Sequence, residues 1–183
     1  MTLEEFVRWD DGTDARYELI RGLTVGRPIE PPAHSFLLAR LGAIVDNALK
    51  SQPEQVALIT SALPIPDRND TCYLADIVIA PRPERWGDPL IADPLLVIEI
   101  VSPDTFGHDL YTKRPDYMSI ANLREIVCLN SDSVFAEAFR RRGAQWLSEV
   151  VQGRSATLSL ASIGIEISMA VLYDGLPISE RPA

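Results

Sequence analysis

The sequence predicts a single domain of mixed α/β (α+β) class, with helices packed on a central mixed β-sheet and additional hairpins near the C-terminus. Three observations predict it: an amphipathic helical segment from His34 to Lys50, two strongly apolar strand-like runs, and short β segments separated by turn residues in the second half. With 183 residues, of which 46% are hydrophobic and 23% charged, the chain has the size and composition of one globular domain.

The first fifty residues predict two helices and a strand. Thr2-Leu3-Glu4-Glu5 is a capping-box pattern that opens a short helix ending before Asp10. Arg16 to Ile20, with Gly22 just beyond, predicts a strand and a turn. The segment from His34 to Lys50 places its apolar side chains on one helical face: Leu37, Leu38, Leu41, Ile44, Val45, Ala48 and Leu49.

The middle of the chain predicts three strands and a second helical region. A strand is expected from Gln55 to Thr60. Leu74 to Ala80 and Leu95 to Val101 are apolar runs bounded by turn residues, which is typical of central strands buried on both faces. The helical region follows at about Asp104 to Ala121.

The last third predicts short strands and a hairpin. Arg140-Arg141-Arg142-Gly143 is typical of a hairpin tip. Two further segments, Leu158 to Leu160 and Ile165 to Ile167, either complete the sheet or pair between protomers. The other expected strands are Ile126 to Leu129, Val134 to Phe139 and Trp146 to Val151.

The net charge limits the function classes that the sequence allows. Seventeen Lys and Arg residues against 26 Asp and Glu residues give a formal charge of −9. A surface this acidic does not coat nucleic acid or an anionic membrane, so a nucleic-acid role has to come from a local site. Basic residues that could meet a phosphate backbone are sparse, chiefly Lys113, Arg114 and Arg140 to Arg142.

Compartment signals favour a cytoplasmic protein with no membrane partner. No segment approaches the roughly 18 consecutive apolar residues of a membrane helix, and the acidic start from Met1 to Phe6 is unlike a signal peptide. Cys72 and Cys128 lie inside apolar runs without zinc-ligand spacing, so we expect small core residues in a reducing compartment.

The most informative residue is Glu99, which stands in the middle of the apolar run Leu95 to Val101. Burying a lone carboxylate costs several kcal/mol or forces its protonation. Charged residues are almost never fully buried unless they are paired or bind a metal. The pattern therefore favours a functional site, with a strand-end ion pair to a Lys or Arg as the alternative.

Asp76 begins a second apolar run in a similar way. Alone, an Asp at this position is more often a turn or capping group. Paired with Glu99 on a neighbouring strand, it becomes half of an oxygen-ligand site that suits Mg²⁺, for which Mn²⁺ is a possible substitute. Glu18 is a third candidate, although by itself it cannot be told from a solvent-facing strand residue.

Lys113 is the candidate cation of the site. Asp109, Lys113 and Tyr117 are spaced to share one face of a continuous helix. Lys113 is either a solvated partner of Asp109 or a cation at a metal-bound water or a transferring phosphate. Pro115 complicates this, because it disfavours helical geometry at Arg114 and either breaks the helix or restarts it in a first turn.

Several sequence blocks occur in order from Met1 to about Val171. They are Arg16-Tyr17-Glu18-Leu19-Ile20-Arg21-Gly22, His34, Ala75-Asp76-Ile77-Val78, the segment from Asp93 to Pro103, Asp109 with Lys113 and Tyr117, and Leu123-Arg124-Glu125-Ile126-Val127. In this order they resemble the Uma-type restriction endonucleases, a bacterial branch of the PD-(D/E)XK nuclease superfamily. The resemblance implies a restriction-endonuclease-like fold and a homodimer. One departure is Ala75-Asp76, where the superfamily has Pro-Asp.

The resemblance also implies roles for individual residues. Asp76 and Glu99 become the metal-binding acids and Glu18 the additional acid. Lys113 takes the place of the superfamily lysine, displaced onto the following helix, since the usual position is Val101 here. His34 matches a family histidine, with a local hydrogen bond at the start of a helix as the alternative reading.

The sequence is therefore consistent with three alternative functions. The first is a Mg²⁺-dependent endonuclease acting on DNA, in which Asp76, Glu99 and the Ile100 carbonyl hold the metal and Glu18 orients a water or helps a second ion. The second is a catalytically inactive protein of the same fold that serves as a dimerising or partner-binding module. The third is a hydrolase of small phosphate esters, which needs no extended basic groove.

Overall fold

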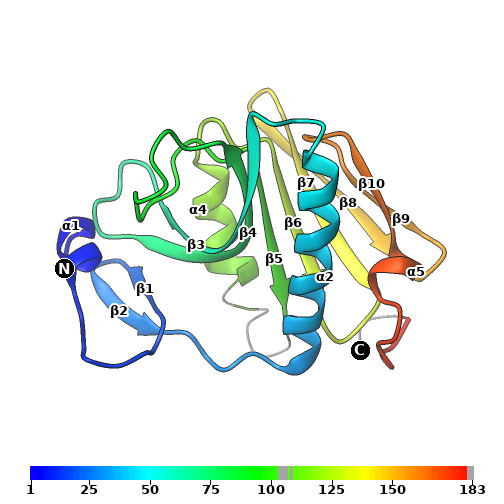
Figure 1. The fold of residues 1–183 in the computed structure, drawn as a ribbon, viewed down its shortest axis with the longest axis horizontal. Helices are drawn as coiled ribbons and strands as arrows, with labels where there is room; N and C mark the ends of the chain where they lie inside the picture. The colour runs from blue at the N-terminus through cyan, green and yellow to red at the C-terminus, as the bar shows by residue number, and fades with distance from the viewer. Residues whose placement is uncertain (103–106, 108, 181–183) are drawn as a thin grey trace.

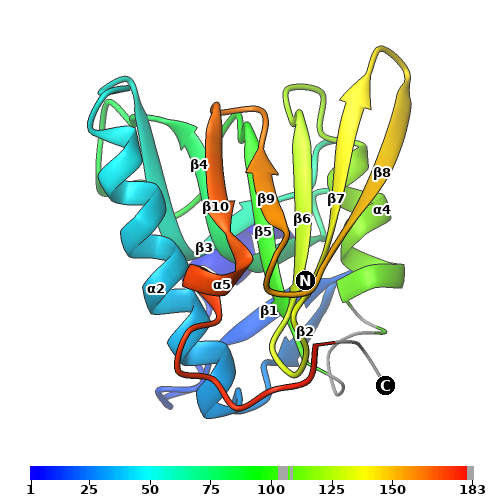
Figure 2. The ribbon, with the colours of Figure 1, turned by 90° about the vertical axis from the view of Figure 1, so that its right-hand side faces the viewer.

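The computed structural model describes residues 1–102, 107 and 109–180 and shows a large mixed sheet with few helices (Figure 1). Helix α2 and a C-terminal hairpin cover one face of the sheet, and helix α4 lies on the other (Figure 2). The predicted α+β class is confirmed.

The helical elements are α1 (Leu3–Arg8), α2 (Pro32–Leu49), a π-helical turn η1 (Asp109–Lys113), α4 (Arg114–Met118) and α5 (Met169–Leu172). The strands are β1 (Tyr17–Ile20), β2 (Leu23–Gly26), β3 (Gln55–Pro64), β4 (Cys72–Pro81), β5 (Leu96–Val101), β6 (Glu125–Asn130), β7 (Phe135–Arg142), β8 (Gln145–Gln152), β9 (Thr157–Leu160) and β10 (Ile165–Ser168).

Local sequence signals account for the N-terminal elements. The capping box forms as predicted, because the Glu5 amide donates to Thr2 Oγ1 and the Thr2 amide donates to Glu5 Oε2. Helix α2 begins at Pro32, two residues before the predicted start, since proline suits the first turn of a helix. Its buried face carries four of the predicted residues: Leu37, Leu41, Val45 and Leu49.

The main sheet has the strand order β2-β1-β4-β5-β6-β7-β8, with β3 on the other edge of β4. Among the strands of the described residues, only β5 and β6 run parallel, and the segment containing η1 and α4 connects them. Strand β4 is central because β3 pairs with it from Cys72 to Pro81. Its second edge is divided, since β1 pairs at Cys72 and β5 pairs at Ile77 to Ile79. This division positions the candidate site.

Alternation along the strands sorts apolar side chains into two cores, one on each face of the sheet. On β5, Ile98 and Ile100 pack with α2, α5 and the C-terminal hairpin. Val97 and Val101 pack on the other side with Tyr117 of α4. Strands β4 to β6 are therefore buried on both faces, as the apolar runs predicted.

The helical region predicted at about Asp104 to Ala121 is helical at the residues that the structure describes from 107 to Met118, with a π-helical turn from Asp109 to Lys113 followed by α4, while residues 103–106 and 108 lie outside the described residues. One sequence-based expectation needs correction. Strands β9 and β10 do not complete the main sheet. They pair with each other and form a separate hairpin packed over the core next to α2.

Both cysteines are buried in the cores, as predicted. Burial, with the charge of Glu18 adding to it, raises the pKa of the Cys72 thiol to about 12. Among the described residues, no helix is both long enough and apolar enough to cross a membrane.

A buried ion pair attaches the C-terminal hairpin to the sheet. The Glu125 carboxylate is 1% exposed and accepts hydrogen bonds from Arg140 Nε, the Ser162 amide and the Ser162 hydroxyl. The guanidinium of Arg140 also donates to the Ser159 carbonyl of β9. One carboxylate thus joins β6, β7 and the turn after β9.

We predict that Glu125→Gln lowers the free energy of unfolding by about 2–4 kcal/mol, because Arg140 loses its buried counter-charge and the two backbone amides lose a charged acceptor. Urea unfolding followed by circular dichroism measures the change. Glu166→Gln is the matched control on the exposed side of β10 and should stay within about 0.5 kcal/mol. Equal effects of the two substitutions would contradict this role of Glu125.

Candidate functional site

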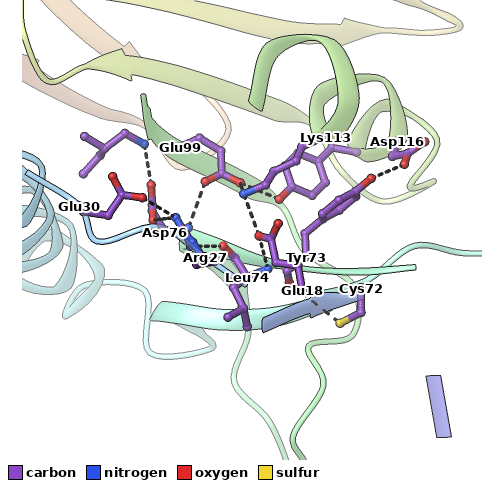
Figure 3. A network of polar contacts seen from close by, with 12 residues as sticks. Glu18, Arg27, Glu30, Cys72, Tyr73, Leu74, Asp76, Glu99, Lys113 and Asp116 are labelled. Carbon is purple, nitrogen blue, oxygen red and sulfur yellow. Dashed lines mark hydrogen bonds and ion pairs between the residues drawn. The ribbon is translucent and has the colours of Figure 1, made fainter. Parts of the chain in front are cut away.

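The candidate site lies where β1 and β5 separate along the second edge of β4. Glu18, Asp76 and Glu99 come from these three strands and converge there (Figure 3). The register that pairs Ile77 with Ile98 makes Asp76 and Glu99 opposite neighbours, and the ladder ends at that point. Each carboxylate is 2–3% exposed.

The three carboxylates replace hydrogen bonds that the sheet does not make. Alternate residues of β4 direct their backbone groups to the divided edge. The Leu74 amide donates to Glu18 Oε1 at 3.0 Å, and the Asp76 amide donates to Glu99 Oε2 at 3.4 Å. From β5, the Ile100 amide donates to Asp76 Oδ2 at 2.8 Å. Each acid is therefore fixed by the backbone of a neighbouring strand.

Distortion of β3 accompanies this arrangement. Thr60 has a φ of 47° and interrupts the pairing of β3 with β4 opposite Asp76. A β-branched residue is a conformational outlier in this region, and such outliers cluster at functional sites. The irregular backbone of β3 therefore lies directly opposite the residue of β4 that carries the acid.

Lys113 reaches the acids from the segment that connects β5 to β6. Its Nζ lies 2.9 Å from Glu18 Oε1 and 3.5 Å from Glu99 Oε1, and the residue is 1% exposed. The Tyr117 hydroxyl, one turn later, donates to the same Glu99 oxygen at 2.6 Å. The prediction that Lys113 and Tyr117 share a face is confirmed, whereas the side chain of Asp109 lies outside the described residues.

Pro115 does not direct Lys113 away from the acids. The π-helical turn ends at Lys113, and α4 begins at Arg114 with Pro115 in its first turn, where an amide hydrogen is not required. The Arg114 guanidinium lies over the Phe139 ring, 4.5 Å from its centroid. The lysine therefore supplies the cation.

Arg27, which follows β2, is a second cation that the sequence did not reveal. Its Nη1 donates to the Leu74 carbonyl at 2.6 Å, and its Nη2 lies 3.3 Å from both Asp76 Oδ1 and Glu30 Oε1. The side chain is 12% exposed. Burial lowers the pKa of the guanidinium, but the surrounding carboxylates outweigh burial and raise it.

His34 contacts Asp76 from the other face of the sheet. Its Nε2 lies 3.1 Å from Asp76 Oδ2, and both side chains are buried. The alternative of a local hydrogen bond at the helix start is therefore wrong for this nitrogen. Burial raises the pKa of the Asp76 carboxyl, but the His34 contact and the Arg27 charge outweigh it and hold the pKa below its ordinary value.

The donor chemistry fits a hard divalent cation. Glu18, Asp76 and Glu99 carry three negative charges, against the two positive charges of Arg27 and Lys113, so a divalent cation finds oxygen ligands and uncompensated charge. Within the part of the chain that the structure describes, no three His, Cys, Asp or Glu side chains form a group arranged to hold a metal. Mg²⁺ often binds one or two carboxylates and completes its shell with water and phosphate oxygens.

The structure thus brings most of the predicted site together. Glu18, Asp76, Glu99, Lys113 and His34 meet, and Ile100 contributes its amide. No rule of sequence spacing points to Arg27. The only available signal is the need to compensate buried acids, which does not say which arginine does so.

The arginines expected to meet a phosphate backbone include two that are engaged in the fold. Arg140 pairs with Glu125 and Glu149. Arg141 donates to the carbonyl of Met118 at the end of α4 and to those of Ile120 and Leu123 beyond it. Carboxylates and backbone carbonyls of the fold therefore already hold both guanidinium groups.

Comparison with known proteins agrees with this fold. A solved structure of a putative nuclease belonging to DUF820 from Anabaena variabilis superposes with a TM-score of 0.77 at 20% identity, covering 94% of this chain and 97% of that one. The uncharacterized protein slr1290 from Synechocystis sp. is 26% identical over 175 residues, covering 94% of this chain and 91% of that protein. A family model described as "Uma2: Putative restriction endonuclease" matches residues 3–171. Because that match spans most of the chain, the protein belongs to the Uma2 family of putative restriction endonucleases.

Proposed function

We propose that this protein is an endonuclease that hydrolyses DNA phosphodiester bonds with Mg²⁺, for which Mn²⁺ can substitute. The observation that carries the proposal is the convergence of Glu18, Asp76 and Glu99 with Lys113 from four separate elements at one break in the sheet. Membership of a nuclease family supports it. Action as a homodimer in the cytoplasm belongs to the same proposal.

Asp76, Glu99 and the Ile100 carbonyl are the proposed ligands of the metal, and Glu18 orients a water or helps to hold a second ion. Bound Mg²⁺ generates the nucleophile from water and stabilises negative charge on the phosphoryl oxygens. The chain prepares this site by keeping Asp76 ionised, since His34 and Arg27 hold the pKa of its carboxyl below the ordinary value.

Lys113 is the proposed catalytic cation. Its ammonium is held between Glu18 and Glu99, so the side chain is already ordered in one conformation. From there it is positioned to donate to the attacking water or to a phosphoryl oxygen. Tyr117 fixes the orientation of Glu99 by donating to the oxygen that Lys113 also contacts. In this proposal Lys113 acts on the reacting groups directly, and Tyr117 acts through its hydrogen bond to Glu99.

A partner-binding module without activity is the second candidate, and one observation favours it. Each of the three carboxylates already contacts an internal cation, so two of the three negative charges are compensated without a metal. A small phosphate-ester hydrolase would use the same residues, and the net charge of −9 does not count against it.

We predict that Mg²⁺-dependent nicking of a supercoiled plasmid falls at least about 100-fold in Asp76→Asn and in Glu99→Gln, because each removes a charge that binds the metal and the transition state. Gel electrophoresis of nicked and linear products measures the rate. Glu166→Gln, on exposed β10, should cut at the wild-type rate. Equal rates in all four proteins would overturn the assignment of the acids.

Titration calorimetry separates the nuclease from the inactive module. We predict that wild type binds Mg²⁺ and that Asp76→Asn removes this binding while Glu166→Gln keeps it. Binding by wild type together with plasmid nicking supports the nuclease. Binding without any nicking supports the module, and no binding at Asp76 contradicts the proposed metal site.

Replacing Lys113 should make stability depend on the metal. We predict that Lys113→Met loses about 3–5 kcal/mol of unfolding free energy, because Glu18 and Glu99 lose a buried cation. Added Mg²⁺ should then raise the melting temperature of Lys113→Met more than that of wild type, since the metal supplies the missing charge. Differential scanning calorimetry measures both.

Lys50→Met is the matched control for this experiment, because Lys50 is an exposed lysine at the end of α2. Its melting temperature should respond to Mg²⁺ as wild type does. An identical response to Mg²⁺ in Lys113→Met and Lys50→Met would argue against a cation site shared with Lys113.

A further inference from the structure

Both oxygens of the Asp76 carboxylate are engaged by other groups. Oδ2 accepts from the Ile100 amide at 2.8 Å and lies 3.1 Å from His34 Nε2. Oδ1 lies 3.3 Å from Arg27 Nη2. A metal that binds Asp76 through Oδ1 therefore meets the guanidinium of Arg27 at the same oxygen.

The contacts of Arg27 are unequal. Its Nη1 is anchored at 2.6 Å to the Leu74 carbonyl, which faces the divided edge of β4 and has no strand partner there. Its Nη2 makes two longer contacts of 3.3 Å, to Asp76 and Glu30. Hydrogen bonds to ionised groups are ordinarily 2.7–2.9 Å long. The guanidinium can therefore keep its anchor while Nη2 leaves Asp76.

A cavity of about 370 Å³ lies directly beside this contact. Its wall contains the side chains of Arg27, Glu30, His34 and Asp76, together with Arg16 at the rim. This cavity gives Nη2 a second place to donate, because an anionic group that enters it meets Arg27 next to Asp76. Arginine is well suited to this exchange, since its fork binds carboxylate and phosphate alike.

We propose that Arg27 is an internal counter-ion that competes with the divalent cation for Asp76 and, once displaced, binds a phosphate group of the substrate in the adjacent cavity. The proposal rests on the proposed function for the identity of the metal and the phosphate. It makes metal and phosphate binding mutually favourable, because the metal releases the donor that the phosphate uses. Arg27 thus becomes a phosphate-binding residue of the site, in addition to the three acids and Lys113.

The experiment measures binding rather than cleavage. Isothermal titration calorimetry gives the Mg²⁺ affinity of wild type, Arg27→Gln and Arg27→Lys, and the binding lost in Asp76→Asn defines the portion at Asp76. Arg27→Gln should bind Mg²⁺ about tenfold more tightly than wild type, because the metal no longer displaces a charged competitor. Arg27→Lys should also bind more tightly, because one ammonium cannot keep the contacts to Leu74, Glu30 and Asp76 together.

The second measurement tests the coupling. The same titrations are repeated with inorganic phosphate and, separately, with a phosphorothioate-linked dinucleotide that resists hydrolysis. In wild type, either probe should raise the Mg²⁺ affinity severalfold, and in Arg27→Gln this gain should disappear. Coupling to the dinucleotide identifies a nucleic-acid phosphate as the ligand, whereas coupling to inorganic phosphate alone identifies a small phosphate ester.

Arg16→Gln is the matched control, because it makes the same change of charge at an exposed position of the same cavity. Its Mg²⁺ affinity should stay within about twofold of wild type, since a solvated charge acts weakly at a distance. Equal tightening in Arg16→Gln and Arg27→Gln would show a general charge effect and overturn the proposal.

Other outcomes also decide the matter. Unchanged or weaker Mg²⁺ binding in Arg27→Gln overturns the proposal, because Arg27 then only holds Asp76 in place. Absence of Mg²⁺ binding at Asp76 in wild type and both Arg27 variants overturns it as well. Tighter binding in the Arg27 variants without any nicking by wild type supports the competition while contradicting the nuclease, so the two proposals fail separately. If Arg27→Gln does not fold, Arg27→Lys carries the same comparison.

Discussion

The divided edge of β4 is the constraint on which the rest of the site depends. Strand β1 pairs with one end of this edge and β5 with the other, so the backbone groups of Leu74 and Asp76 face a gap. Buried backbone groups need partners. Side chains supply them, because Glu18 accepts from the Leu74 amide, Arg27 donates to the Leu74 carbonyl and Glu99 accepts from the Asp76 amide. The side chains that satisfy the backbone groups of β4 are therefore the same ones that form the candidate site.

Charge compensation explains how three acids remain in the interior. Desolvating an ion costs several kcal/mol, and only close counter-charges with good hydrogen bonds offset that cost. Lys113 offsets it for Glu18 and Glu99 from one face of the sheet, while Arg27 does so for Asp76 from the β1–β2 side. Each cation belongs to a different segment from the strand acids that it compensates. Docking of those segments onto the sheet and neutralisation of the acids consequently depend on each other.

The sequence predicted those parts of the site that conflict with local packing. Glu99 stands out because a carboxylate in the middle of a buried strand has no packing role, and Asp76 gains meaning from pairing with it. Glu18 does not stand out, since its burial results from β1 docking against β4, which no local pattern encodes. The role of Arg27 could not be predicted either, because its contact with Asp76 also depends on how distant segments dock. The π-helical turn before Arg114 could not be predicted, because the spacing of Lys113 and Tyr117 fits an ordinary α-helix equally well.

The acidic net charge has a specific consequence once the arginines are placed. Arg40, Arg141 and Arg154 each donate to several backbone carbonyls, so these cations serve the fold rather than a polyanion. Counterion release from DNA requires basic groups that are available to phosphates, and a chain of charge −9 with arginines committed in this way has few. In the proposed nuclease, the attraction for a phosphate would arise locally, because a metal bound by the acids would reverse the sign of the field there. Phosphate binding that depends on the metal would then restrict the proposed enzyme to phosphates that reach this site.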